Sequence, residues 1–267
     1  MKVLLYFNSD KEIHGEYFAE VKRLLNKYGV DFDCAINDVE PESLDFDAIF
    51  VVGGDGTLLR RTEIANKNAL PIIGINCGKL GFLSEFEANE IESAIALFKN
   101  GDLIRDDRLT LKITYKDKDY YALNDAVISR TYEENKRLVV SVGVKIGYCG
   151  LQTITGDGVI IATPTGSTAY SLSAGGAIIA PNAKALCLTP ICAHSFSAKP
   201  FVCAAEEKFT LTHEGGAKAG LFIDGKLVGV LELGDSVKIS EAERQTVFLR
   251  KKGFDFFARL NNKLQER

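Results

Sequence analysis

The sequence has no tryptophan, a single methionine and three histidines in 267 residues. None of the histidines belongs to an HExxH pattern, so a histidine-based metal site has no support. The six cysteines include no CxxC pair. This spacing excludes the common zinc motifs, and a disulfide framework is not expected in a chain of this length. We therefore interpret the cysteines as buried thiols.

Long apolar runs and an excess of basic charge are also missing. The N-terminal apolar run ends at Asn8 and is too short for a signal peptide, and no later run reaches the roughly 18 apolar residues that span a bilayer. We therefore expect a cytoplasmic protein with no membrane partner. The net charge of −4 leaves no basic footprint for a nucleic acid. The length allows one large domain or two modest ones.

The first hundred residues alternate between strand and helix patterns. Continuous apolar runs predict strands that are buried on both faces of a sheet, and helical periodicity predicts the helices. The strands are expected at 2–8, 48–52 and 71–76, and the helices at 16–28, 57–67 and 90–99. Repeated units of this length indicate an α/β domain with a Rossmann-like parallel sheet, whose ligand-binding turns lie at the carboxyl ends of the strands.

After Gly101 the apolar residues recur at every second position, which is typical of half-buried antiparallel strands. This alternation is found at 109–116, 138–148, 209–213 and 237–239. The tail then returns to a helical pattern, and we expect this helix to pack back on the first domain. The predicted division is an α/β domain of residues 1–101, joined by the tail 251–267, and a β-rich domain of residues 102–250.

Two polar, glycine-rich segments follow apolar strands. Residues 53–57 read GGDGT, and residues 163–176 read TPTGSTAYSLSAGG. Glycine lets backbone approach a ligand closely, and hydroxyl groups supply short hydrogen bonds, so the two segments suggest one phosphate-bearing ligand held between them. The signatures GxxxxGK[ST] and GxGxxG are absent after the strands, so neither a Walker-type NTPase nor an ordinary dinucleotide dehydrogenase is implied.

Asp55 is the unusual residue of the first segment. Backbone N–H groups at a helix N-terminus can cradle phosphate oxygens, but a carboxylate repels them. Asp55 therefore acts as a base or as an anchor for hydrated Mg²⁺, or else it only caps the helix that follows.

Three further polar elements join these segments. Residues 74–83 (GINCGKLGFL) follow the next apolar strand, so their glycines and Asn76 are expected near the first loop. Asn124 and Asp125 interrupt an alternating stretch, either as a hairpin turn or as a ligand contact. Asp157 stands between two glycines and either bonds to an adenine edge or a ribose, or serves its own turn.

Together these motifs resemble those of the NAD kinase (ATP-NAD kinase) family. That family carries GGDGT, an N-x-G-x-LGFL segment, an asparagine–acidic pair, and a [GS]-D-G strand followed by TP-[ST]-GSTAY. This sequence matches all four in that order. GGDGT alone is shared with lipid kinases and, more distantly, with phosphofructokinases, whereas the TPTGSTAYSLSAGG run is far more specific.

The resemblance implies an α/β N-terminal domain, a β-rich C-terminal domain that binds NAD, and a site between them. Family members phosphorylate the 2′-hydroxyl of the adenosine ribose of NAD and produce NADP. They use ATP as the phosphoryl donor and a divalent metal ion, for which Mg²⁺ is expected here. NAD and ATP are thus the small-molecule partners, and a homo-oligomer, either a dimer or a tetramer, is expected.

The resemblance also assigns roles to residues of the matching motifs. Asp55 is expected to be the general base, and Gly56 to contact the ligand through its backbone. The phosphate loop is completed by Gly53, Gly54 and Thr57. The other expected substrate-binding residues are Asn124, Asp125, Asp157, Thr168, Ala169, Tyr170, Ser171, Leu172 and Ser173, with Arg60 and Thr165 added by position. Tyr170 is expected to form a flat apolar wall of the NAD site.

Two positions depart from the commonest family pattern. Lys226 follows Asp224 and Gly225 where members often read DGQ, and Lys199 stands where arginine is frequent. Lysine keeps the charge of arginine but not its bidentate geometry. His194 is interpreted as structural, and the charged stretch 130–137 as a solvated loop.

Two other classes of protein remain open. One is a lipid kinase built on the same GGDGT core, and the other is a non-catalytic module that senses NAD(P). The hydroxyl-rich segment 163–176 suits a soluble dinucleotide better than a lipid. The presence of Asp55, Asn124 and Asp157 argues against a module without turnover.

Overall fold

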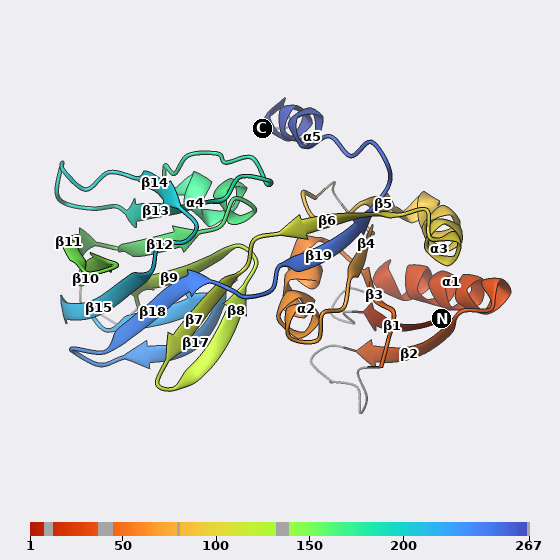
Figure 1. Cartoon of the computed structure of the whole chain (residues 1–267), viewed down its shortest axis with the longest axis horizontal. Helices are drawn as coiled ribbons and strands as arrows, with labels where there is room; N and C mark the ends of the chain where they lie inside the picture. Colours follow the sequence, from red (N-terminus) through yellow and green to blue (C-terminus); the bar gives the residue numbers. More distant parts are fainter. Residues whose placement is uncertain (8–12, 37–44, 79–80, 132–138, 266–267) are drawn as a thin grey trace. The chain divides into compact units, whose positions relative to one another are not determined.

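The computed structural model describes residues 1–7, 13–36, 45–78, 81–131 and 139–265. The chain forms two compact units (Figure 1). The first unit consists of Met1–Asp107 and Thr246–Arg267, and the second of Arg108–Gln245. Lys79 and Leu80 of the second glycine segment, and most of the stretch 130–137, lie outside the described residues.

The first unit is built on one sheet, most of whose neighbouring strands run parallel. Its strands are β1 (Lys2–Phe7), β2 (Asp31–Ile36), β3 (Ala48–Val52), β4 (Ile72–Asn76), β5 (Phe86–Glu87), β6 (Ile104–Arg108) and β19 (Thr246–Arg250). The order is β2-β1-β3-β4-β19-β6, and β5 also pairs with β4. The neighbours β1–β2, β1–β3, β3–β4, β4–β5 and β4–β19 run parallel. Strands β3 and β4 therefore end side by side at the same edge.

Helices cover both faces of this sheet (Figure 1). The helices on the two faces are α1 (Ile13–Tyr28), α2 (Asp55–Lys67) and α3 (Ile91–Asn100), which follows the 3₁₀ helix η1 (Ala88–Glu90). The last helix, α5 (Phe256–Gln265), lies near the C-terminus. Helices α1 and α3 pack on the face that carries Val3, Leu5 and Phe50, and α2 packs on the opposite face, where Leu58 meets Gly74. Because both faces are covered, β3 and β4 are buried at every position, as their continuous apolar sequences predict.

The second unit contains two six-stranded sheets. One runs β11 (Cys149–Gly156), β10 (Val140–Ile146), β15 (Phe209–Gly216), β18 (Ser236–Glu241), β7 (Leu111–Tyr115) and β8 (Lys118–Ala122). The other runs β14 (Phe201–Ala204), β13 (Ala185–Ile191), β12 (Gly158–Ala162), β9 (Asp125–Arg130), β16 (Ala219–Ile223) and β17 (Lys226–Leu231). Alternate residues of both sheets, such as Ile113, Val142 and Ile161, share one apolar core. The two-residue alternation predicted for β7, β10, β15 and β18 is confirmed.

The outer face of the second sheet is also covered. Val127 and Ile160 point to this face, where Ile179 packs with them in a smaller apolar cluster. The segment that precedes Ile179 contains the 3₁₀ helix η2 (Gly166–Thr168) and the short helix α4 (Tyr170–Ser173). This cover explains why β12 is buried at all five positions although it belongs to an antiparallel sheet.

The interpretation of the cysteines as buried thiols is wrong for three of the six. Cys77 and Cys187 are buried, whereas Cys34, Cys149 and Cys192 are exposed. Cys34 and Cys149 lie on β2 and β11, which are edge strands of their sheets, and an edge strand has fewer neighbours to cover its side chains. Among the described residues, no helix has the length and apolar character that crossing a bilayer requires.

Replacing Gly74 by alanine tests the contact between α2 and β4. The added Cβ would lie 2.6 Å from Cδ1 of Leu58 and 3.0 Å from Cα of Ser84. Overpacking of this kind costs about 1–3 kcal/mol, so we expect a lower urea midpoint for the first unit. Gly15→Ala in α1 is the matched control, because nothing lies within 4 Å of its added Cβ. Equal midpoints for the two variants would contradict this packing.

Candidate active site

The GGDGT turn joins the buried strand β3 to helix α2. Gly53 has a φ of 151°, and its N–H donates to the Ile75 carbonyl oxygen of the neighbouring strand β4 at 2.9 Å. A Cβ on Gly53 would lie 2.6 Å from Oγ1 of Thr57, so glycine lets the first turn of the helix close against the strand. Gly54 is the N-cap of α2, and Gly56 is exposed. The positive end of the helix is therefore accessible to an anion.

Two side chains of α2 near this turn, Thr57 and Arg60, differ in their exposure. The Thr57 side chain is buried against Gly53, so it supports the turn from the inside. Arg60 is exposed and follows Gly56 by one helical turn, on the same face of α2. Besides Asp55, which is half-buried, the accessible groups among the predicted residues of the first unit are the backbone at Gly54 and Gly56 and the side chain of Arg60.

Asp55 is the first residue of α2, and its carboxylate is bound by a separate loop. Oδ2 accepts a hydrogen bond from the Phe82 N–H at 2.7 Å, and Oδ1 accepts one from the Leu83 N–H at 3.2 Å. The N-cap position belongs to Gly54, so the alternative in which Asp55 caps its own helix is not what is observed. A carboxylate has about four lone-pair positions, so two amide bonds leave room for a ligand.

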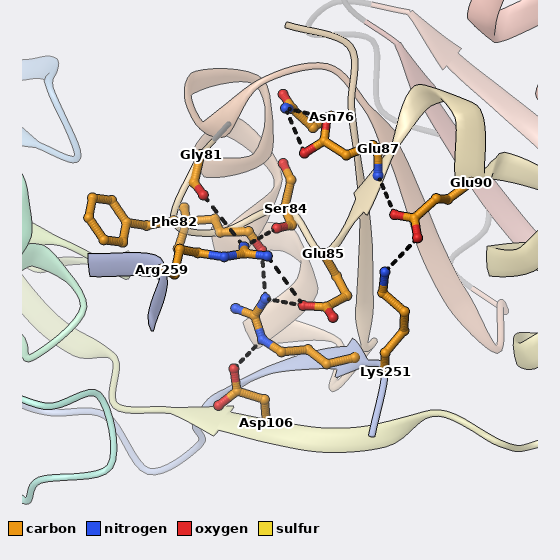
Figure 2. Close-up of polar contacts among 12 residues, drawn as sticks. Asn76, Gly81, Phe82, Ser84, Glu85, Glu87, Glu90, Asp106, Lys251 and Arg259 are labelled. Atoms are coloured by element: carbon orange, nitrogen blue, oxygen red, sulfur yellow. Dashed lines mark hydrogen bonds and ion pairs between the residues drawn. The ribbon is translucent and has the colours of Figure 1, made fainter. Parts of the chain in front are cut away.

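Gly81 allows the loop to reach Asp55. A Cβ at this position would lie 2.0 Å from Oδ1 of Asp55, so any larger residue would displace the carboxylate. The expectation that the second glycine segment lies near the first loop is confirmed. Asn76 is nearby in sequence but serves its own turn, since its side-chain amide donates to the Gly78 carbonyl oxygen at 3.1 Å. The same amide donates to the Glu87 carboxylate at 3.1 Å (Figure 2).

Asn124 and Asp125 lie where the chain passes from one sheet of the second unit to the other. Strand β8 ends at Ala122 and β9 begins at Asp125, and the two strands belong to different sheets, so the alternative of a β-hairpin turn is wrong. The next loop packs directly on this crossing. Thr163 donates through its N–H to the Asn124 carbonyl oxygen at 2.9 Å and through Oγ1 to that of Leu123 at 2.5 Å. A Cβ on Gly166 would lie 2.0 Å from the Asn124 oxygen.

Asp224 holds the crossing from the other side, a role that the sequence analysis did not identify. Its carboxylate accepts N–H bonds from Leu123 at 2.8 Å, Asn124 at 2.8 Å and Asp125 at 3.1 Å. Asp224 has a φ of 47°, and Gly225 follows at φ 80°. The Asp-Gly pair is a common turn signal, but nothing local to it points to residues a hundred positions earlier.

Asp125 is buried beside this second carboxylate. Burial, together with the negative charge of Asp224, raises the pKa of Asp125 to about 7. Among the described residues, the side chains of Asn124 and Asp125 have no hydrogen-bond partner in the protein. Two buried polar side chains without protein partners are suited to bind a polar ligand.

The segment 163–176 divides into supporting and accessible residues. Thr165 is buried and accepts a bond from Nη1 of Arg108 at 3.3 Å, and Oγ1 of Thr168 donates to the Thr165 carbonyl oxygen at 3.2 Å. The Ser171 hydroxyl pairs with that of Thr189 at 2.8 Å in the interior. The remaining predicted residues of the segment are half-buried or exposed, and they are Ala169, Tyr170, Leu172 and Ser173.

Asp157 connects β11 to β12 and is half-buried. Its carboxylate accepts a hydrogen bond from Nε of Arg130 at 2.7 Å, and its carbonyl oxygen accepts one from the Arg130 N–H at 3.0 Å. The side chain therefore does not serve its own turn but pairs with the neighbouring strand β9. A ligand hydroxyl that approaches Asp157 would meet a carboxylate whose orientation is already fixed.

The part of the chain that the structure describes contains no group of three or more histidine, cysteine, aspartate or glutamate side chains placed to hold a metal ion. An isolated carboxylate such as Asp55 suits Mg²⁺, which keeps several waters and is commonly held by one or two carboxylates together with substrate phosphates.

Comparison with known proteins assigns both units to a class of phosphotransferase. Residues 5–103 match the family model of the ATP-NAD kinase N-terminal domain, and residues 123–251 match that of the ATP-NAD kinase C-terminal domain. The NAD kinase of Caldicellulosiruptor bescii is 33% identical over 266 residues, which cover 100% of both chains. The chain therefore belongs to the ATP-NAD kinase family and is an enzyme with NAD kinase activity, as the resemblance of its motifs predicts.

Two solved structures share this fold. An NAD kinase from Archaeoglobus fulgidus in complex with ATP is 26% identical, with a TM-score of 0.80 and coverage of 100% of both chains. Yeast NADH kinase complexed with NADH superposes with a TM-score of 0.86 at 23% identity, covering 99% of this chain and 88% of that chain. The prediction of an α/β N-terminal part followed by a β-rich C-terminal part is confirmed.

The raised pKa of Asp125 predicts a pH dependence of stability. Its value of about 7 in the folded protein lies above the ordinary value near 4 in an unfolded chain, so folding favours the protonated acid. The associated stability is present below pH 4 and is lost as the pH rises through 7. We expect Asp125→Asn to be more stable than the parent at pH 8, by up to about 4 kcal/mol, and the gain to shrink at pH 5. Urea unfolding of the parent and of Asp125→Asn at both pH values measures this difference in the free energy of unfolding.

Asp119→Asn is the control for this experiment, because Asp119 is a surface residue paired with Lys112. Its effect on the unfolding free energy should be small and nearly the same at pH 5 and pH 8. A gain for Asp125→Asn that does not change between these two pH values would contradict the assignment.

Proposed function

We propose that this NAD kinase transfers the terminal phosphoryl group of ATP to the 2′-hydroxyl of the adenosine ribose of NAD, forming NADP, with Asp55 as the general base. The observation that carries the proposal is the Asp55 carboxylate, held by the amides of Phe82 and Leu83 at the start of helix α2. A carboxylate oriented in this way can accept a hydrogen bond from a hydroxyl group and take its proton as the bond to phosphorus forms.

The glycine turn before Asp55 supports the placement of phosphate. Nothing lies within 4 Å of a Cβ built on Gly54 or on Gly56, so the backbone at these positions is open to a ligand. N–H groups and the positive end of α2 would stabilise phosphate oxygens, with the exposed side chain of Arg60 as a further cation. Gly53 and Thr57 support the turn, and in phosphoryl transfer such positioning and charge stabilisation supply most of the rate.

A divalent metal ion, Mg²⁺ in the proposal, would be carried by the donor phosphates. When bound, it neutralises part of the charge on those phosphates and so reduces their repulsion from Asp55. The chain's contribution is the carboxylate of Asp55, which can bind a water of the hydrated ion while the two amides keep it in place.

Residues of the second unit bind NAD in this proposal. Asn124 and Asp125 offer polar side chains without protein partners, and Asp157 offers a carboxylate oriented by Arg130. Thr165, Thr168 and the residues 169–173 line the dinucleotide. Because the hydroxyls of Thr165 and Ser171 are already bonded to Arg108 and Thr189, contacts from these two positions would use their backbone groups. Tyr170, 45% exposed, would supply a flat face for a ring.

Three broader features complete the proposal. The C-terminal helix α5 packs on the first unit, supported by the bonds of Arg259 to the carbonyl oxygens of Gly81 and Ser84. The protein acts in the cytoplasm. It forms a homo-oligomer, a dimer or a tetramer, which is supported by the edge strand β11 with the exposed side chain of Leu151, and by the exposed Tyr148 in the turn before this strand.

The substrate is tested by measuring NADP formation from NAD, ATP and Mg²⁺ with the purified protein, and by offering a diacylglycerol or a sphingoid base in a parallel assay. We expect NADP and no phosphorylated lipid. Phosphorylation of the lipid alone would identify a lipid kinase, and binding of NAD without any turnover would identify a sensing module.

Asp55→Asn is expected to lower kcat by about 10²- to 10⁴-fold, because the amide cannot accept the proton of the 2′-hydroxyl. The side chain keeps its size and one oxygen that accepts a hydrogen bond, so the dissociation constant of NAD should change little. Steady-state kinetics and NAD titration measure the two effects. Glu63→Gln is the control, since Glu63 pairs with Lys67 on the exposed side of the same helix. An Asp55→Asn enzyme with parental kcat would remove Asp55 from the mechanism.

Tyr170→Ala is expected to weaken NAD binding rather than turnover. Stacking of a base on an aromatic ring contributes about 1–3 kcal/mol, so the dissociation constant should rise by roughly 5- to 150-fold. The side chain is partly exposed, and the variant should fold normally. Tyr170→Phe keeps the ring and should bind NAD like the parent. The stacking role is refuted if titration gives Tyr170→Ala the parental dissociation constant.

A further inference from the structure

The loop of residues 81–85 has charged groups on two sides. Its N–H groups at Phe82 and Leu83 point to the carboxylate of Asp55. Its carbonyl groups are bonded instead to arginines of the C-terminal segment, Arg250 and Arg259. The C-terminal segment and Asp55 therefore bind the same short stretch of backbone from different directions.

Arg259 comes from helix α5 and reaches this loop with the N–H groups of its guanidinium (Figure 2). Nη1 donates to the Ser84 carbonyl oxygen and, at 3.5 Å, to that of Gly81. Nη2 lies 3.9 Å from the Glu85 carboxylate. The carbonyl of Gly81 and the N–H of Phe82 belong to one peptide group, so a single peptide unit lies between the guanidinium of Arg259 and the carboxylate of Asp55.

Arg250 holds the same loop from strand β19. Its side chain is fully buried, and Nη1 donates to the Leu83 carbonyl oxygen at 3.1 Å and to the Glu85 carboxylate at 3.2 Å. Nε is paired with Asp106. The two arginines share Glu85, which is itself buried. Because a buried charge is stable only with its partners in place, this network fixes the loop in one arrangement.

Aromatic rings complete the attachment of the tail. The Phe254 ring lies 4.2 Å from the Arg250 guanidinium and 5.1 Å from that of Arg259, within the range of cation–π contacts. The Phe82 ring, next to the amide that binds Asp55, lies 6.3 Å from the Phe256 ring of α5. The C-terminal segment thus meets the loop through apolar contacts as well as through charge.

We propose that Arg259 is a positioning residue for phosphoryl transfer, because it fixes the loop of residues 81–85 so that the amides of Phe82 and Leu83 hold Asp55 in its reactive orientation. This inference rests on the proposed role of Asp55 as the general base. Arg259 acts through the peptide group of Gly81 and Phe82 and through Ser84, without contact to the substrate. A misplacement of a catalytic group by about 1 Å can cost about 10²-fold in rate.

Arg259→Ala is expected to lower kcat by about 10- to 100-fold and to leave the KM for NAD within about threefold. Arg259→Lys keeps the charge and one donor for Ser84 but loses the fork geometry, so it should recover part of kcat. Amide hydrogen exchange at Phe82 and Leu83 should become faster in Arg259→Ala. Asn262→Ala, an exposed substitution on the same helix, is the control and should match the parent in all three measurements.

A double-mutant cycle with Asp55→Asn separates positioning from a general structural role. If Arg259 acts through Asp55, Arg259→Ala should cost little further kcat in the Asp55→Asn background, since effects of residues that act as a unit are not additive. An equal loss in both backgrounds would overturn the inference, as would parental kcat in Arg259→Ala. If the alanine variant does not fold, Arg259→Gln, which keeps a donor without the charge, takes its place in the cycle.

The failure of the base and the failure of this inference give different results. Parental kcat in Asp55→Asn alone would show that the proposed base is wrong. A large loss of kcat in Asp55→Asn together with parental kcat and unchanged amide exchange in Arg259→Ala would leave the base in place and overturn only the positioning role of Arg259.

Discussion

The two hydrogen bonds from the amides of Phe82 and Leu83 to Asp55 determine much of the arrangement of the first unit. They require β3 and β4 to be parallel neighbours, so that the loops after both strands meet at one edge of the sheet. They require a glycine at position 81, because a Cβ there would collide with the carboxylate. A side chain held by backbone amides has one orientation and still keeps lone pairs for a ligand, which is the combination that a catalytic acid or base needs.

In the second unit, the carboxylate that is bound by backbone amides supports other residues, whereas in the first unit the bound carboxylate is itself the candidate catalytic group. Asp224 accepts three backbone N–H bonds and so fixes the crossing at which Asn124 and Asp125 emerge between the two sheets. Here the backbone-bound carboxylate supports its neighbours, and its charge raises the pKa of the buried Asp125. In both units an acidic side chain bonded to main-chain amides fixes the position of a loop that comes from a distant part of the sequence.

The sequence predicted those features that depend on local pattern. The continuous apolar runs of β3 and β4, the alternation in β10 and the GGDGT turn all follow from periodicity and glycine chemistry, and the structure contains them. The edge strand β2 was not predicted: it lacks the continuous apolar run of β3 and β4, and only Ala35 of its six residues is buried.

Contacts between residues far apart in the sequence could not be predicted from local sequence patterns. Nothing near Asp224 or Arg259 in the sequence indicates that their side chains bind backbone groups about a hundred or more residues away. The motifs identified which segments carry chemistry, whereas the residues that orient those segments follow only from the three-dimensional contacts. Asn124 illustrates the limit, since a polar pair within an alternating stretch has the same pattern at a hairpin as at a passage between sheets.

Strand β19 lies between β4 and β6 in the sheet of the first unit, although the entire second unit separates it from them in sequence. During synthesis, the first hundred residues therefore emerge with an unfilled position in their sheet, and Arg250 is absent from the loop that binds Asp55. Strand β19, which fills the sheet, and Arg250, which binds the loop beside Asp55, are added only after the second unit has been translated. A ribosome-bound chain that stops before β19 would thus carry every glycine-rich motif and still lack the strand that completes the sheet beside β4.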